Sequence, residues 1–175
     1  MKMTFAERLR SLFQDPYAAA KEIGISEGQN VADIGAGKGY LTIPASTIVG
    51  KKGLVYSVEP DPARSRKIRE RVASEGIENV RVLTTGAEQL EDIPSDSVDL
   101  AFSAFSMHHF NDKQVGLAEI RRTLRNGGKF YVWDRVPGAI IRHGTRPEEL
   151  DRLSRGFARF ELLSARRTVK ARFTK

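Results

Sequence analysis

Hydrophobic positions along the chain alternate between short apolar runs, typical of strands, and the three- to four-residue spacing of helices. Buried strands are predicted at residues 30–35, 53–60, 79–86, 97–105 and 129–135. Helices are predicted at residues 39–49, after Asp61, and at 112–125, while a polar loop follows the third strand. A strand–helix alternation repeated five times forms right-handed crossovers and a parallel sheet covered on both faces.

Helical and extended patterns also flank this alternation. Residues 4–22 have helical spacing in two pieces, because Asp15-Pro16 caps and restarts the helix, and Gly24 ends it. A short helix near 146–154 precedes two alternating segments, 157–165 and 168–175, that fit an antiparallel pair. The sequence therefore predicts one α/β domain with a Rossmann-like, doubly wound, seven-stranded sheet that is mostly parallel. We expect a single domain over residues 1–175, with a helical cap (1–28) over the site and a core at 29–175.

Composition narrows the class of protein. The 175 residues include no cysteine, which removes disulfides, thiolate metal sites and cysteine nucleophiles together. No apolar run approaches the roughly 20 residues of a membrane-spanning helix, and the amphipathic start is unlike a signal peptide. We therefore expect a cytoplasmic protein. The net charge of +7 gathers at 63–71, 119–125 and 152–175, which fits either solvated helix faces or a surface that docks RNA.

Three glycines lie directly behind the first strand, in the stretch DIGAGKG at residues 33–39. A triphosphate-binding loop needs Gly-Lys-Ser/Thr, but here Lys38 precedes Gly39 and no Ser or Thr follows. The dinucleotide fingerprint needs its third glycine one place later, where this chain has Tyr40. A third pattern retains the acid two residues before the first glycine, Asp-x-Gly-x-Gly-x-Gly.

That third pattern resembles the first motif of class I S-adenosylmethionine-dependent methyltransferases. The stretch LAEIRRTLRNGGKFYVWD at residues 117–134 also resembles the family's passage from a helix into the fifth strand, with Asn126 in place of a proline. The combination is most similar to the small "type 11" group, which includes quinone-biosynthesis methyltransferases. The resemblance implies S-adenosylmethionine as methyl donor and S-adenosylhomocysteine as product.

The resemblance also implies where the cofactor binds. The glycine loop would contribute Asp33, Gly35, Ala36, Gly37 and Gly39. Glu59, at the end of the second strand and followed by Pro60, would accept hydrogen bonds from the ribose hydroxyls. The adenine loop has Gly86 where the family commonly has an acid, followed by Ala87 and Glu88. Either Glu88 substitutes for that acid or backbone and packing hold the adenine. Ser103 on the fourth strand completes the predicted set.

Candidates for acid–base chemistry follow the fourth and fifth strands. His108 and His109 border the expected acceptor position, and Asp134 lies at the carboxyl end of the fifth strand. Since adjacent side chains diverge on a helix or strand, we expect no metal site at the histidine pair. Phe13 and Tyr17 of the N-terminal cap and the mobile-looking stretch 135–147 are candidates to cover the acceptor.

The predicted reaction is an SN2 methyl transfer to a small-molecule acceptor, in which alignment and water exclusion do most of the work. An RNA or protein methyltransferase that docks through the basic helices is one alternative, and an NAD-dependent oxidoreductase is another. The sequence leaves open the acceptor atom (C, N or O) and the oligomeric state.

Overall fold

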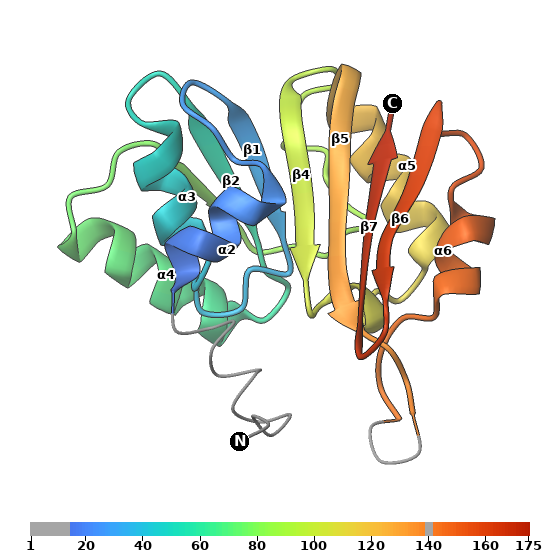
Figure 1. Cartoon of the computed structure of the whole chain (residues 1–175). Helices are drawn as coiled ribbons and strands as arrows, with labels where there is room; N and C mark the ends of the chain where they lie inside the picture. The colour runs from blue at the N-terminus through green and yellow to red at the C-terminus, as the bar shows by residue number, and fades with distance from the viewer. Residues whose placement is uncertain (1–14, 139–141) are drawn as a thin grey trace.

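The computed structural model describes residues 15–138 and 142–175, which form one seven-stranded sheet with the strand order β3-β2-β1-β4-β5-β7-β6 (Figure 1). Five strands are parallel: β1 (Asn30–Ile34), β2 (Leu54–Val58), β3 (Val80–Leu83), β4 (Val98–Ala104) and β5 (Leu124–Arg135). The last two strands are antiparallel to their neighbours: β6 (Arg159–Ala165) and β7 (Thr168–Thr174). The predicted mixed sheet with a closing antiparallel pair is confirmed.

Helices begin and end where the sequence carries capping residues. The helices are α2 (Pro16–Ile23), α3 (Thr42–Val49), α4 (Pro62–Ser74), α5 (Lys113–Thr123), α6 (Pro147–Leu153) and the single 3₁₀ turn η1 (Met107–His109). Asp15 and Asp61 each accept two backbone N–H hydrogen bonds ahead of a proline in the first turn, as predicted. Gly24 ends α2 with φ of 100°. The first piece of the predicted N-terminal helix lies outside the described residues.

Two apolar layers cover the sheet. Within β1, Val31 belongs to the apolar layer that includes α2 and α3, while the next residue, Ala32, belongs to the layer on the other face that includes α5 and α6. Figure 1 shows α2 and α3 over the part of the sheet that contains β1 and β2, and α5 and α6 beside the part that contains β5 to β7. A strand buried on both faces explains why the first strand is a continuous apolar run.

The crossover from β3 to β4 departs from the predicted alternation. Residues 84–97 form a loop rather than a helix, so the fivefold repeat of strand and helix was wrong at this point. Leu90 and Ile93 in that loop are fully buried and fill the place of a helix against the sheet. The polar loop expected after the third strand is thereby confirmed.

The fifth strand begins earlier than expected. It starts at Leu124 and includes the Asn-Gly-Gly stretch, and its register with β4 shifts between Val98 and Leu100. The Gly127 N–H donates to the Lys175 carbonyl, and the Lys175 N–H donates to the Gly128 carbonyl. Backbone pairing with the end of the chain therefore extends a strand that the sequence pattern starts at residue 129.

The predicted cap over the site has one described helix, α2. It packs through Ala19, Ala20 and Ile23 into the apolar layer shared with α3. Tyr17 is 43% exposed on this helix, and Phe13 lies outside the described residues. A cap over the site therefore stays a prediction. Within the described part of the chain, no helix has the length and apolar character needed to cross a membrane.

Candidate active site

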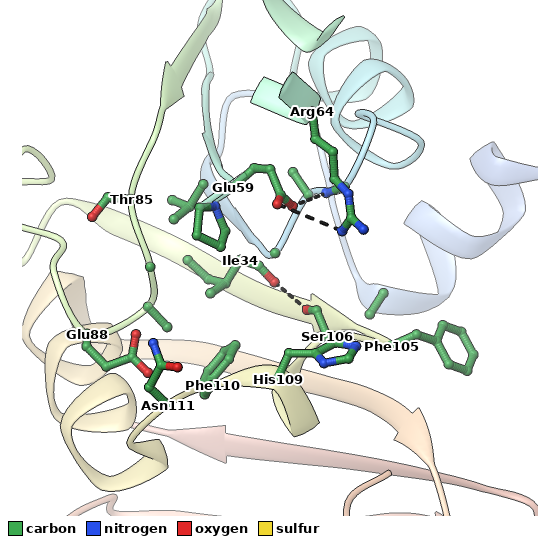
Figure 2. A pocket seen from close by; sticks show the side chains of 18 of the residues that line it. Ile34, Glu59, Arg64, Thr85, Glu88, Phe105, Ser106, His109, Phe110 and Asn111 are labelled. Carbon is green, nitrogen blue, oxygen red and sulfur yellow. Dashed lines mark hydrogen bonds and ion pairs between the residues drawn. The ribbon is translucent and has the colours of Figure 1, made fainter. Parts of the chain in front are cut away.

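A pocket of about 430 Å³ opens at the carboxyl ends of β1, β2 and β4, the sheet edge at which open α/β folds bind ligands. Figure 2 shows Glu59 and Arg64 on one side of it and His109, Phe110 and Asn111 on the other. Nine of the predicted site residues line this pocket: Gly35, Ala36, Gly37, Glu59, Pro60, Gly86, Ala87, Glu88 and His109. The other five do not line it: Asp33, Gly39, Ser103, His108 and Asp134.

The three loop glycines have left-handed backbones but meet different surroundings. A Cβ at Gly35 would lie 2.4 Å from the Cβ and Oγ of Ser106, so only glycine allows this close approach. A Cβ at Gly39 would crowd Ile68 of α4 at 3.3 Å, which makes Gly39 a helix-packing residue. A Cβ at Gly37 would meet nothing within 4 Å. The middle glycine therefore leaves open space at the pocket wall.

Glu59 is the central charged group of the pocket. Its side chain is only 5% exposed, and Oε2 accepts a hydrogen bond of 2.7 Å from the Gly37 N–H. Oε1 accepts from the Asp61 N–H at 3.1 Å and lies 4.0 Å from the Arg64 guanidinium. A carboxylate oxygen has room for more than one hydrogen bond, so Glu59 can also accept from a diol in the pocket. The same carboxylate would repel a phosphate at that position.

Asp33 lies beneath the glycine loop. Thr42 donates from Oγ1 to Asp33 Oδ2 at 2.7 Å, and the Thr42 hydroxyl also lies 3.0 Å from that of Ser57. Burial raises the pKa of Asp33 to about 7, and the charge of Glu59 adds to the shift while the Thr42 hydrogen bond opposes it. Asp33 therefore ties the end of β1 to the start of α3, whereas Glu59 holds the Gly37 N–H of the loop.

Glu88 occupies the space beside Gly86. Its Oε1 accepts from the Asp112 N–H at 3.0 Å, which fixes the side chain against the start of α5. Its Oε2 lies 2.7 Å from the position that a Cβ at Gly86 would take. The Glu88 carboxylate therefore lies where an acidic side chain at residue 86 would begin. This fits the predicted alternative in which Glu88 replaces the acid that the family commonly has at that position.

Two residues at the end of β4 belong to the pocket although sequence reasoning missed them. Ser106 donates from Oγ to the Ile34 carbonyl at 2.7 Å and shares a hydrogen bond with Ser103. Phe105 has φ of 56°, a strained backbone for a non-glycine residue, and its N–H donates to the Trp133 carbonyl. Ser103 thus acts on the pocket through Ser106. Their position directly after a buried strand was the only available signal.

Asp134 is fully buried beneath the histidine pair. Its carboxylate lies 2.8 Å from Nδ1 of His108, accepts from the His108 backbone N–H at 3.1 Å, and accepts from the Thr145 hydroxyl at 2.7 Å. The His108 side chain is 8% exposed. These contacts fix the orientation of the His108 ring.

His109 lines the pocket. Its ring centroid lies 4.0 Å from that of His108, so the expectation that the adjacent side chains diverge was wrong for this 3₁₀ turn. Burial lowers the pKa of His109, as do the charges of His108, Arg64 and His143, whereas Asp134 acts in the opposite direction. The neutral imidazole, which can accept a proton, is therefore favoured near pH 7.

Comparison with known proteins identifies the family. The methyltransferase domain family matches residues 31–128. The ubiquinone/menaquinone biosynthesis C-methyltransferase UbiE of Marinomonas sp. (strain MWYL1) is 34% identical over 110 residues, which are 62% of this chain and 43% of that protein. The aklanonic acid methyltransferase DauC of Streptomyces sp. (strain C5) is 29% identical over 71% of this chain and 56% of that protein. The chain thus spans about half the length of these relatives.

Solved structures agree with this assignment over a larger part of the chain. A SAM-dependent methyltransferase from Aquifex aeolicus superposes with a TM-score of 0.74 at 25% identity, over 93% of this chain and 91% of that one. The family's cofactor carries a ribose diol without a phosphate, which fits the buried Glu59 carboxylate at the pocket wall. The oxidoreductase alternative loses its support. The chain belongs to the methyltransferase domain family, among the class I S-adenosylmethionine-dependent methyltransferases.

Proposed function

We propose that the protein catalyses methyl transfer from S-adenosylmethionine to a small-molecule acceptor. The observation that carries the proposal is the buried Glu59 carboxylate, held by the Gly37 and Asp61 N–H groups in a pocket of about 430 Å³. A volume of this size suits a cofactor with little space left over, so the acceptor enters at the open side.

The chain's own residues would hold the cofactor from three directions. The glycine loop at 35–37 lies along one wall, Glu59 accepts from the ribose hydroxyls, and Glu88 faces the adenine amine. When bound, S-adenosylmethionine supplies a methyl group on a positively charged sulfur, which is already activated for a single SN2 displacement.

An acceptor would contact the other side of the pocket. Phe105 and Phe110 line it, and apolar rings favour a flat, partly apolar acceptor. UbiE is a C-methyltransferase of quinone biosynthesis, which supports a carbon nucleophile, and DauC, an aklanonic acid methyltransferase, supports a small organic acceptor. A carbon acid must lose a proton when it is methylated, which requires a base close to the acceptor.

His109 is the proposed base. Its neutral ring lines the pocket and would take the acceptor's proton on a ring nitrogen. His108 and Asp134, predicted as catalytic, do not line the pocket and act as positioning residues, since Asp134 fixes the ring against which His109 packs.

A transfer assay tests the proposal. The purified chain is incubated with S-adenosylmethionine labelled in the methyl group and with naphthohydroquinone, acetylacetone, catechol, total RNA or a mixture of basic proteins in turn. We expect label in an enolisable or phenolic small molecule, at a rate that falls about 100-fold in His109→Gln with little change in KM. Label that appears only in RNA or protein would contradict a small-molecule acceptor and favour docking through the basic helices.

A further inference from the structure

A second cavity, of about 350 Å³, lies between α5 and the segment that runs from α6 into β6. It shares no lining residue with the glycine-loop pocket. Leu117 is buried in its lining, and Leu153 and Phe157 are half-buried there. Apolar side chains therefore form the inner part of a cavity within the size range of small-ligand sites.

Three arginines line the same cavity, Arg121 from α5 and Arg152 and Arg155 from the end of α6 and the turn after it. All three are exposed, and within the described residues none has an ion pair or a side-chain hydrogen bond. Other cations on these helices are paired, as Lys113 is with Glu149 across α5 and α6. The cavity thus collects positive charge that the fold leaves uncompensated.

The positive charge of the whole chain is also concentrated in its second part, which contains α5 and α6. Residues 113–175 contain 16 Lys and Arg against 6 Asp and Glu, whereas residues 1–112 contain 13 against 16. The net charge of +7 therefore comes entirely from the part of the chain that builds α5, α6 and the last strands. The unpaired arginines of the cavity thus belong to the segment with the positive excess, which favours anions near them.

Guanidinium chemistry narrows the ligand class. Arginine presents a planar fork of donors that matches phosphate and carboxylate oxygens, and three such groups suit a doubly charged phosphate better than a single carboxylate. Aliphatic residues behind them suit a hydrocarbon or ring. We propose that the cavity between α5 and α6 binds a phosphate monoester carried on an apolar body.

Nucleic acid fits this cavity less well. Binding of single strands uses aromatic side chains as stacking platforms for the bases. Phe157 is the only aromatic residue among those that line the cavity, and its ring packs on Phe173 with centroids 5.1 Å apart. The ligand chemistry could still come from two sources, a soluble phosphorylated metabolite or the head group of phosphatidic acid in a membrane.

Calorimetry with decyl phosphate, below its micelle concentration, tests the proposal on the whole chain. We expect wild type to bind decyl phosphate at least about tenfold more tightly than inorganic phosphate, because only the former fills the apolar part. The triple variant Arg121→Ser, Arg152→Ser, Arg155→Ser should lose at least about tenfold in affinity. Ala118→Trp, which fills the cavity from its exposed side, should lose binding without any change of charge.

A matched control removes equal charge elsewhere. Lys51→Ser, Lys52→Ser, Arg81→Ser takes three exposed cations from the opposite end of the sheet and should leave the affinity within about twofold of wild type. Both triple variants should bind S-adenosylhomocysteine as wild type does, which separates this site from the methyltransferase pocket.

Sedimentation with phosphatidylcholine vesicles, with and without phosphatidic acid, distinguishes the two sources. If wild type sediments with the acidic vesicles and the arginine variant does not, the proposal holds with a lipid ligand. If wild type binds free decyl phosphate but not the vesicles, the proposal holds with a soluble ligand. Failure to bind decyl phosphate, equal losses in the two triple variants, or tighter arginine-dependent binding of single-stranded RNA would overturn it.

Discussion

At the scale of single residues, neighbouring glycines of the loop differ in what they tolerate. Gly35→Ala places a Cβ 2.4 Å from Ser106 and also puts alanine in a left-handed backbone conformation. Gly37→Ala causes only the backbone strain, because its Cβ would have no atom within 4 Å. We expect the free energy of unfolding to fall by about 3–5 kcal/mol for Gly35→Ala and about 1–2 kcal/mol for Gly37→Ala. Urea denaturation measures both, and equal losses would show that Ser106 does not constrain the loop.

Asp33 makes the stability of the protein depend on pH. The folded-state pKa of about 7 lies above the ordinary value of 3.8, so the folded protein binds this proton more tightly than the unfolded chain does. The resulting stabilisation is complete below about pH 4 and is lost as the pH rises to about 7. Asp33→Asn retains an oxygen acceptor for Thr42 but cannot ionise.

We therefore expect Asp33→Asn to gain stability relative to wild type as the pH rises from 4 to 7, by at most about 1.4 kcal/mol for each pH unit. Above that range the difference should stay constant. Urea denaturation at a series of pH values provides the measurement, and a difference that does not vary with pH would show that Asp33 has an ordinary pKa.

At the scale of elements, the antiparallel pair is held to the parallel strands by an aromatic cluster. Phe173 of β7 is fully buried, with ring centroids 5.7 Å from Phe130 of β5, 5.1 Å from Phe157 and 5.0 Å from Phe160 of β6. Removing its ring leaves a cavity between these strands, so we expect Phe173→Ala to cost about 3–5 kcal/mol.

The matched control for Phe173 is Leu163→Ala, on the neighbouring strand β6, where the side chain is 45% exposed. That change should cost about 0.5 kcal/mol or less. The midpoint of chemical denaturation by circular dichroism compares the two variants. A loss below 1 kcal/mol in Phe173→Ala would mean that the antiparallel pair is held mainly by its backbone hydrogen bonds.

Element types could be predicted because apolar spacing and capping residues carry the information locally. Asp15 and Asp61 each precede a proline, and both cap a helix in the structure. The start of β5 could not be predicted, since Leu124 joins the strand through pairing with Val98, and the glycines of that strand pair with Lys175 at the chain end. Contacts between distant segments decide such boundaries.

In the candidate site, too, local features were predictable and contacts between distant segments were not. Glu59 follows from its place at the end of a strand, which fixes the edge of the sheet where it lies. The motif also includes Asp33, but whether that side chain faces a ligand or the core depends on Thr42 and Ser57. Ser106 and Arg64 enter the pocket from other elements, and one-dimensional spacing does not show their approach.

At the scale of the whole molecule, the fold separates two chemical surfaces. The glycine-loop pocket contains the acids Glu59 and Glu88, while the cavity between α5 and α6 contains uncompensated arginines. The chain's excess of cations over acids lies within residues 113–175, the segment that includes α5 and α6. A cofactor with a diol and a positively charged sulfur suits the first surface, and an anion suits the second.

Calorimetric titration of S-adenosylhomocysteine tests whether the Glu59 carboxylate holds the cofactor. We expect wild type to bind with a micromolar Kd and Glu59→Gln to bind at least about tenfold more weakly, because the amide cannot replace both acceptor oxygens of the carboxylate. Glu78→Gln, at an exposed carboxylate outside the pocket, should match wild type. Absence of binding to wild type, or equal affinity of wild type and Glu59→Gln, would contradict cofactor binding through Glu59.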